Sequence, residues 1–162
     1  MRMAKPISPK VVFLDLVPIG SNLVLIGASY RMLQSLFASS ILTCYLVAAL
    51  MLIATIVSLV ALTLHETTLR ETLRVLSIQS FLLIIGFAAI HLGAGLKGDA
   101  EPIDFWDALY FSIVTWTTLG YGDLQPQDGL RVLASLQAVI GYLFLGVVVG
   151  LVGAAFNPPK QS

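Results

Sequence analysis

Charge is what this chain of 162 residues has least of, because aspartate, glutamate, lysine and arginine make up only 11% of it. A soluble domain carries roughly 25% charged residues to cover its surface. With 57% hydrophobic residues and a mean hydropathy of +0.92, the composition is that of a single-domain integral membrane protein. Basic and acidic residues number nine each, and this net charge of zero argues against nucleic acid as a partner.

Cysteine and histidine are also scarce, which excludes most thiol and metal chemistry. Cys44 is the single cysteine, so no disulfide can form within the chain, and its apolar surroundings indicate a packing role. His65 and Glu66 match the start of a zinc protease motif, but no second histidine follows at the required spacing. We expect His91 at the membrane edge. We therefore expect neither a reactive thiol nor a zinc protease site.

Long apolar runs are abundant instead. A helix that spans a bilayer needs about 20 mostly apolar residues. Three segments meet this requirement, namely 41–64, 75–96 and 131–156. We therefore expect an all-α membrane protein in which these segments are transmembrane helices.

The N-terminal segment 1–40 contains a weaker candidate helix at 11–29, which includes Asp15, Pro18 and Asn22. Three interpretations stay open. The segment is a span kinked at Pro18, an interfacial helix, or a signal sequence.

Lysine and arginine in the flanks indicate the orientation, because they favour the cytoplasmic side. The link 65–74 carries Arg70 and Arg74, with a possible Glu66–Arg70 pair, and the C-terminal tail carries Lys160. The N-terminal tail is basic too, which favours four spans over three. We expect a multi-pass protein of the cell (inner) membrane.

The 35 residues from Lys97 to Arg131 lie between two spans and face the outside. Within them, 103–117 has a helical, aromatic-rich pattern and follows Pro102. Asp104 and Asp107 lie in its first turns, where a helix N-terminus favours negative charge. This helix is too short to cross a bilayer, so we expect a half-helix that enters the membrane and stops.

The segment TTLGYGD, from Thr117 to Asp123, follows this half-helix. Irregular backbone persists at membrane depth only where it is buried in protein or lines a watery cavity. Gly120 and Gly122 adopt positive φ without steric cost. If they alternate with ordinary residues in mirror-related conformations, successive carbonyls point to one side and form a cation-binding column, to which the Thr118 hydroxyl adds an oxygen.

The run DFWDALYFSIVTWTTLGYGD closely resembles the pore helix and selectivity filter of potassium channels of the two-transmembrane pore family. The resemblance covers about half of the chain and implies a pore domain at 75–156, of prokaryotic type, with additional N-terminal hydrophobic segments. Its parts are an outer helix at 75–96, a pore helix at 103–117, a filter at 118–123 and an inner helix at 131–156. Leu119 replaces the usual valine, and we expect little effect.

The resemblance also implies residue roles. The backbone carbonyls of Thr118, Leu119, Gly120 and Tyr121, with the Thr118 hydroxyl, bind dehydrated K⁺, and Gly122 lets the Tyr121 carbonyl point inward. The filter is supported by Tyr110, Trp116, Thr117 and Asp123. The Tyr121 ring packs on pore-helix aromatics such as Tyr110, Phe111 or Trp116, and Asp123 anchors the filter at the outer mouth.

One chain supplies a single strip of carbonyls, whereas a dehydrated cation needs a ring. Four identical chains must therefore meet on one axis, which predicts a C4 homotetramer in the lipid bilayer. We predict passive, potassium-selective conduction without enzyme activity, with K⁺ as the permeant ligand and no cofactor. The alternatives are a non-selective cation channel and a non-conducting, channel-like membrane scaffold.

The inner helix holds candidates for a hinge and a gate. Gly141 occupies the position of the family's hinge glycine, whereas Gly141, Gly146, Gly150 and Gly153 also suit close helix packing. Tyr142, Leu145, Val149 and Phe156 share one helical face. They line the central cavity and gate, or they face lipid and neighbouring helices.

Two further features concern ions and gating. The stretch from Lys97 to Arg131 contains six acidic and two basic residues. In four chains together, this excess of negative charge would attract cations to the outer mouth of the channel. Alternatively, the acidic residues only cap helices and interact with water. No helix carries arginine at every third position, so we expect no voltage sensor. Only six residues follow Phe156, from which we expect no cytoplasmic ligand-binding domain. The gating stimulus stays open.

Overall fold

The computed structural model describes residues 41–64, 67–98 and 102–156, together with Gly20, Val24 and Gly27. Several expectations fall outside these residues: the nature of 11–29, the positions of Glu66, Asp99 and Glu101, and that of Lys160. The described part of the chain is mostly helical, with two short strands and irregular connections such as 117–123.

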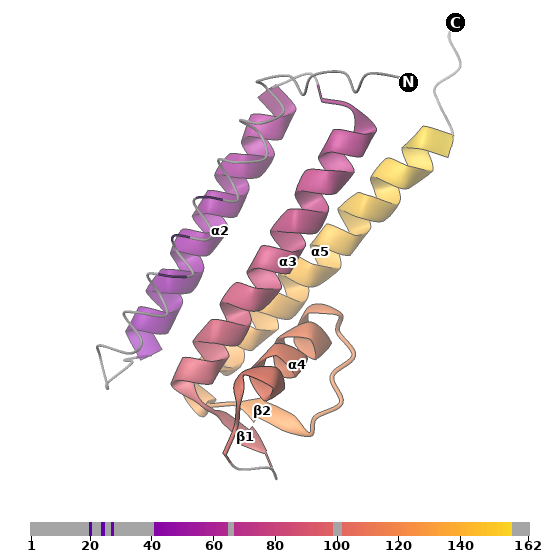
Figure 1. Ribbon diagram of the computed structural model, residues 1–162. Coiled ribbons are helices and arrows are strands. Elements are labelled where there is room, and N and C mark those ends of the chain that lie inside the picture. The colour runs from indigo at the N-terminus through magenta and orange to yellow at the C-terminus, as the bar shows by residue number, and fades with distance from the viewer. Residues whose placement is uncertain are drawn as a thin grey trace, which may run out of the picture.

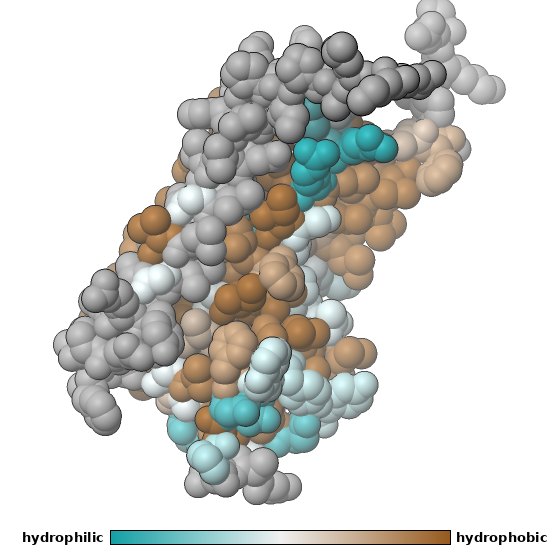
Figure 2. Space-filling view, viewed as in Figure 1, coloured by the Kyte–Doolittle hydropathy of each residue, from teal (hydrophilic) through white to brown (hydrophobic). Residues whose placement is uncertain are grey.

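Three long helices form the body of the protein: α2 (Ile41–Leu64), α3 (Leu69–Ala94) and α5 (Arg131–Phe156) (Figure 1). Within the described residues these three are long and apolar enough to cross a membrane. The bounds of α2 and α5 match the predicted segments 41–64 and 131–156. Figure 2 shows hydrophobic side chains along the length of the helices and hydrophilic ones near the two ends, as expected for helices that cross a bilayer.

Helix α3 begins at Leu69, six residues before the predicted start at Val75. The cause is a capping box: the Thr68 hydroxyl accepts from the Glu71 amide at 3.3 Å, and the Glu71 carboxylate accepts from the Thr68 amide at 2.9 Å. Much of the polar link expected at 65–74 is therefore the first part of a helix. The helix ends at Ala94, followed by Gly95 at φ 89°.

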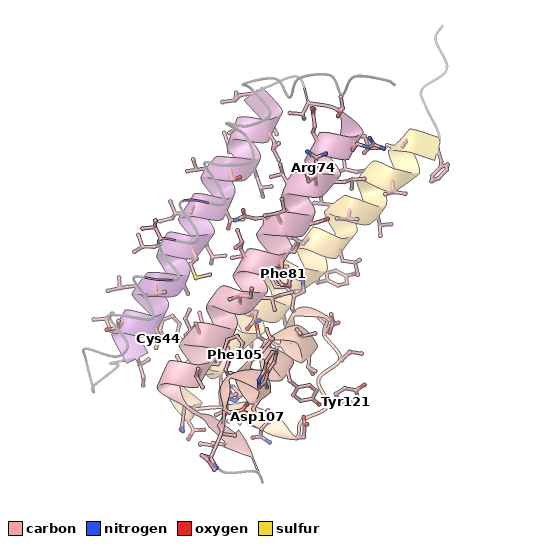
Figure 3. All side chains as sticks on the ribbon, viewed as in Figure 1. Cys44, Arg74, Phe81, Phe105, Asp107 and Tyr121 are labelled. Carbon is pink, nitrogen blue, oxygen red and sulfur yellow. The ribbon has the colours of Figure 1, made fainter. Side chains whose placement is uncertain are left out.

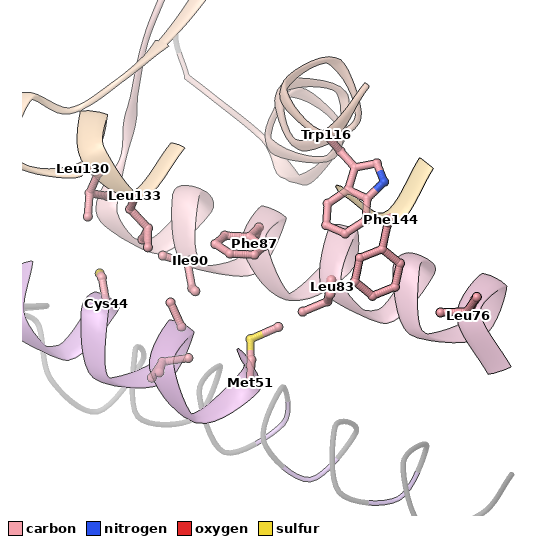
Figure 4. Close-up of a cluster of buried hydrophobic side chains, with 12 residues drawn as sticks. Cys44, Met51, Leu76, Leu83, Phe87, Ile90, Trp116, Leu130, Leu133 and Phe144 are labelled. Carbon is pink, nitrogen blue, oxygen red and sulfur yellow. The ribbon is translucent and has the colours of Figure 1, made fainter. Parts of the chain in front are cut away.

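The core lies along α3, which contacts each of the other helices. Figure 4 shows Met51 of α2 directed toward Leu83 of α3, with Phe87 and Ile90 further along the same helix. Leu83 and Phe87 have no exposed surface, and Cys44 is 1% exposed within the same cluster. The packing role expected for Cys44 is therefore confirmed.

Helix α2 is also held by polar contacts. The Gln79 amide of α3 donates to the Thr55 hydroxyl of α2 at 2.6 Å, and both side chains are buried. The Tyr45 hydroxyl donates to the Gly129 carbonyl at 3.1 Å, just before α5 begins. Hydrogen bonds of this kind join helices in membranes, where apolar contact alone discriminates little. They fix α2 against the rest of the molecule at two heights.

The re-entrant half-helix is α4 (Phe105–Trp116), whose 12 residues pack beside α3 and α5 at one end of the bundle (Figure 1). Asp104 caps it by accepting from the amides of Trp106 and Asp107, and the Asp107 carboxylate accepts from the Asp104 amide at 2.9 Å. The predicted helix 103–117 is thus two residues too long at its start and one at its end. The capping role of both aspartates is confirmed.

A two-stranded antiparallel sheet, absent from the sequence prediction, closes the re-entrant segment. Strand β1 (Leu96–Gly98) pairs with β2 (Leu124–Pro126). A short 3₁₀ helix, η1 (Asp128–Leu130), then leads into α5. The sheet therefore brings the entry and the exit of the segment together, with α4 and the glycine-containing backbone between them.

Candidate functional site

The glycine-containing segment 117–123 leaves the C-terminal end of α4 and is attached to its last turn by three backbone hydrogen bonds. The amide of Thr117 donates to Ile113, that of Thr118 to Thr115, and that of Leu119 to Val114, over 2.9–3.1 Å. The Thr117 hydroxyl also donates to the Ile113 carbonyl at 2.8 Å. The start of the segment therefore moves with α4.

The backbone of this segment alternates in hand. Thr118, Gly120 and Gly122 have positive φ, at 59°, 57° and 81°, whereas Leu119 and Tyr121 between them do not. Positive φ at the two glycines is therefore confirmed. At Thr118 it was not predicted, because a β-branched residue rarely adopts this conformation and bears about 1–3 kcal/mol of strain there. An alternation of this kind directs successive carbonyls toward one side, unlike a strand, whose carbonyls alternate.

The segment is open within its own chain. A Cβ atom added at Gly120 or Gly122 would meet no atom within 4 Å. The side chains of Leu119 and Tyr121 are 59% and 69% exposed. Irregular backbone at membrane depth needs protein or a watery cavity around it. The single chain does not supply the protein, so something else must complete this surface.

Tyr110, Tyr121 and Asp123 meet at the outer end of the segment. The Tyr110 hydroxyl donates to Asp123 Oδ2 at 2.8 Å. Its ring lies parallel to that of Tyr121, with centroids 6.5 Å apart and 2° between the planes. The hydrogen bond to the Asp123 carboxylate raises the pKa of Tyr110 above its usual value. Figure 3 shows Tyr121 at the edge of the molecule, on the connection that follows α4.

Two other aromatic residues of α4 lie elsewhere. The Trp116 ring packs on Phe144 of α5, with centroids 5.5 Å apart (Figure 4), and Phe111 makes an edge contact with His91 at 4.8 Å. Within this chain, Tyr110 is therefore the pore-helix aromatic that stacks on Tyr121. Trp116 supports the segment indirectly, by seating the end of α4 against α5.

Gly141 of α5 lies directly against the end of α4. A Cβ atom at this position would clash with the Trp116 carbonyl oxygen, whereas Gly146, Gly150 and Gly153 have open space around them. Close packing therefore accounts for Gly141. Helix α5 continues through this residue without a break, and the hinge role stays a prediction.

The predicted cavity and gate residues share an exposed face of α5, namely Tyr142, Leu145, Val149 and Phe156. Tyr142 and Leu145 line a cavity of about 240 Å³ under the C-terminal end of α4, together with Thr117 and Thr118. Two of the four residues therefore lie next to the inner end of the glycine-containing segment. The other two lie further along α5, and their predicted role is unchanged.

His91 lies three residues before the end of α3 at Ala94, and its expected place at the membrane edge stays a prediction. It is 0% exposed and lies between α3, α4 and α5, where its Nε2 is 3.3 Å from Gln137 Oε1. Its burial against Gln137 was not predicted, because the sequence interpretation considered His91 alone. A partner on another helix, Gln137, gives this polar side chain a buried place, and the presence of glutamine in an otherwise apolar helix was the signal that pointed to it.

The acidic residues of the re-entrant segment are mostly engaged. Asp104 and Asp107 cap α4, Asp123 accepts from Tyr110, and Asp128 forms an ion pair with Lys97 at 2.8 Å. Within the described residues, local hydrogen bonding therefore accounts for these positions. A field that attracts cations remains a prediction, because it depends on several copies of the chain.

Comparison with known proteins adds independent findings. A family model described as an ion channel matches residues 77–157. A Rhodopseudomonas palustris protein provisionally named a potassium channel protein is 31% identical over 57% of this chain and 23% of its own length. Human potassium voltage-gated channel subfamily A member 4 is 33% identical over 56% of this chain and 14% of its own. The inward rectifier potassium channel Kirbac3.1 of Paramagnetospirillum magnetotacticum is 40% identical over 47% of this chain and 26% of its own.

These matches concern a limited region. The aligned part spans about a quarter or less of each curated relative, as the shares of 23%, 14% and 26% show. No solved structure matches the chain. The matched residues 77–157 include most of α3, all of α4, the glycine-containing segment and α5, which is the region where the geometry described above is found.

Proposed function

Since this chain belongs to the ion channel family, we propose that it is a subunit of a potassium channel and conducts K⁺ passively through a filter at Thr118–Asp123. The relatives named above are named as potassium channels, which supports potassium as the permeant ion. The protein needs no cofactor for this activity and performs no catalysis, because the ion crosses the filter without any covalent bond being formed or broken.

The observation that carries the proposal is the alternating backbone of TTLGYG, with positive φ at Thr118, Gly120 and Gly122. Peptide carbonyls directed to one side replace the water that K⁺ loses when it enters a filter. The carbonyls of Thr118, Leu119, Gly120 and Tyr121, with the Thr118 hydroxyl, form the strip that one chain contributes. Asp123 holds the outer end of the strip through Tyr110.

A single strip cannot surround an ion, so the functional unit is a homotetramer with fourfold symmetry. The uncovered side of the filter supports this assembly, since Gly120 and Gly122 face open space in one chain. So does α5, whose apolar side chains are largely exposed in one chain. Tyr142, Leu145, Val149 and Phe156 then line the axis below the filter.

The protein is a membrane protein, and the charge at its ends supports an orientation. Arg74 lies at the end of α3 opposite to Tyr121 (Figure 3). Arginine favours the cytoplasmic side, so the filter opens to the outside. We assign the tetramer to the cell (inner) membrane, with the start of α3 and the end of α5 on the cytoplasmic side.

Flux into liposomes tests this function. The purified chain is reconstituted in vesicles loaded with K⁺, and uptake of ⁸⁶Rb⁺ and ²²Na⁺ is followed in parallel vesicle samples. Rb⁺ uptake that K⁺ competes for and Na⁺ does not is the expected result. Equal uptake of both ions supports the non-selective alternative. Absence of uptake from a tetramer that is shown to be intact supports the non-conducting scaffold.

A further inference from the structure

Gln137 is a fully buried polar residue in the apolar helix α5, and it joins three helices. Its Nε2 lies 3.0 Å from the Ser112 carbonyl and 2.7 Å from the Ser112 hydroxyl of α4. Its Oε1 lies 3.3 Å from His91 Nε2 of α3. All three residues have 0% exposed surface. Burying an amide side chain in a membrane-spanning helix is costly unless its hydrogen bonds are satisfied. A glutamine buried there therefore indicates a structural or functional role.

The direction of every hydrogen bond in this group follows from one atom. The Ser112 carbonyl can only accept, so the amide nitrogen of Gln137 must face it. The amide oxygen then faces His91, and His91 carries its proton on Nε2. The Ser112 hydroxyl accepts from Gln137 and donates to the Ile84 carbonyl of α3 at 2.7 Å. One set of orientations therefore satisfies all four contacts, and no other does.

The group has a short route to the filter. Ser112 lies on α4, whose last turn holds the amides of Thr118 and Leu119 through the carbonyls of Thr115 and Val114. A shift of α4 along α5 therefore moves the first carbonyls of the filter. Gln137 is the polar contact that we find between α5 and the middle of α4 in the described residues. Packing of Trp116 on Phe144 is apolar and specifies the height of α4 less sharply.

We propose that Gln137 is a positioning residue, which fixes the height of the pore helix through Ser112 and thereby the geometry of the filter relative to the inner helix. This inference rests on the proposed function, because it assigns a purpose to the position of the filter. Ser112 transmits the constraint to α3 through Ile84, and His91 holds the Gln137 amide in the orientation that the Ser112 carbonyl requires.

The test compares Gln137→Met with Gln79→Met. Methionine is close to glutamine in length and removes the hydrogen bonds with little change in volume. Gln79 is a similarly buried glutamine, at 1% exposed, whose amide donates to the Thr55 hydroxyl of α2. We expect the permeability ratio of K⁺ to Na⁺ to fall roughly tenfold in Gln137→Met, because the buried Ser112 carbonyl and the His91 Nε2–H lose their hydrogen-bond partner. In Gln79→Met we expect a change of less than about twofold.

A second variant keeps the proposal testable if Gln137→Met does not fold. Ser112→Ala removes the hydroxyl contacts to Gln137 and Ile84 and leaves the contact with the Ser112 carbonyl. We expect a fall in the permeability ratio of about threefold. In the double variant, which combines Gln137→Met with Ser112→Ala, the permeability ratio should be no lower than in Gln137→Met alone, since both residues act on the filter through the same contact. Additive losses would overturn the proposal, and so would equal losses in Gln137→Met and Gln79→Met.

Two measurements separate this inference from the proposed function. ¹⁵N NMR of His91 should show the proton on Nε2 in the natural protein and a loss of that preference in Gln137→Met. Hydrogen exchange at the amides of Thr118 and Leu119 should be faster in Gln137→Met than in Gln79→Met. If the natural protein conducts no ions, the proposed function fails, and the exchange rates alone decide the inference. Equal exchange in the two variants would contradict it.

Discussion

Replacement of Gly120 by alanine is the perturbation whose consequence follows most directly from the backbone. Gly120 has φ of 57°, in the left-handed region. A Cβ atom there meets nothing within 4 Å in its own chain, so the cost is conformational and not a clash with the same subunit. An L-residue other than glycine bears about 1–2 kcal/mol in this region. Four subunits together would bear about 4–8 kcal/mol, similar to the stability of a whole domain.

The filter is expected to avoid this cost by changing its backbone. When residue 120 leaves the left-handed region, a neighbouring carbonyl turns away from the axis and the ring loses four oxygens. We expect potassium-selective Rb⁺ uptake to fall roughly a thousandfold, because 1.4 kcal/mol corresponds to a factor of ten and the minimum cost is about 4 kcal/mol. The tetramer should persist, since the helices that hold it are unchanged. Uptake and the oligomeric state are measured on the same preparation.

Two controls make the Gly120 experiment specific. Gly146→Ala introduces the same methyl group in open space within the ordinary helix α5, and it should leave uptake unchanged. D-alanine at position 120, introduced by peptide ligation, has the mirror-image preference and should retain uptake. Uptake and selectivity of the natural protein in Gly120→Ala would refute the reasoning. Loss of uptake in D-alanine protein equal to that in Gly120→Ala would show that bulk, not backbone conformation, is responsible.

Three further predictions concern the surroundings of the filter. Tyr110→Phe should shorten the time for which the filter stays conductive at neutral pH, because Asp123 loses its hydrogen bond; electrical recordings measure this. Since the pKa of Tyr110 is raised, the stabilisation from this hydrogen bond is complete below about pH 10 and is lost as the pH rises through the raised pKa. Flux through the natural protein should therefore be constant from about pH 7 to 9 and fall at higher pH, and Tyr110→Phe should not show this fall. Gly141→Ala should destabilise the protein by about 1–3 kcal/mol or displace α4, because the new methyl group meets the Trp116 carbonyl, whereas Gly150→Ala should be neutral; thermal unfolding of both variants decides, and equal stability would contradict the packing of Gly141. Phe87→Ala should cost about 3–5 kcal/mol, because Phe87 has no exposed surface, and a loss below 1 kcal/mol in unfolding experiments would contradict the central place of α3 in the core.

The helices and the site were largely accessible from the sequence, because simple physics determines them. Apolar runs of bilayer length gave α2 and α5 their bounds, and the aspartates at 104 and 107 marked the start of α4 to within two residues. The two glycines of TLGYG predicted positive φ because no other residue adopts it freely. These features depend on neighbours in the chain, which is why a single sequence contains them.

Most of the features that the sequence analysis missed depend on residues far apart in the chain. The early start of α3 was also missed, although it depends on a local feature, the capping box of Thr68 and Glu71. The strand pair, the positive φ of Thr118 and the contact of Tyr110 with Asp123 arise from the way α4 returns to the bundle. The group of His91, Ser112 and Gln137 comes from three helices, and no spacing rule relates residues 25 and 46 positions apart.

We propose that carbonyls from several copies of this chain surround K⁺ on a common axis. Diffraction from crystals of the protein grown with Rb⁺ tests it directly, because anomalous scattering locates that ion. We expect a column of Rb⁺ peaks on a fourfold axis, level with the carbonyls of Thr118 to Tyr121. A structure in which this segment lies at the lipid-facing periphery, or in which the axis holds no ion at that level, would contradict it.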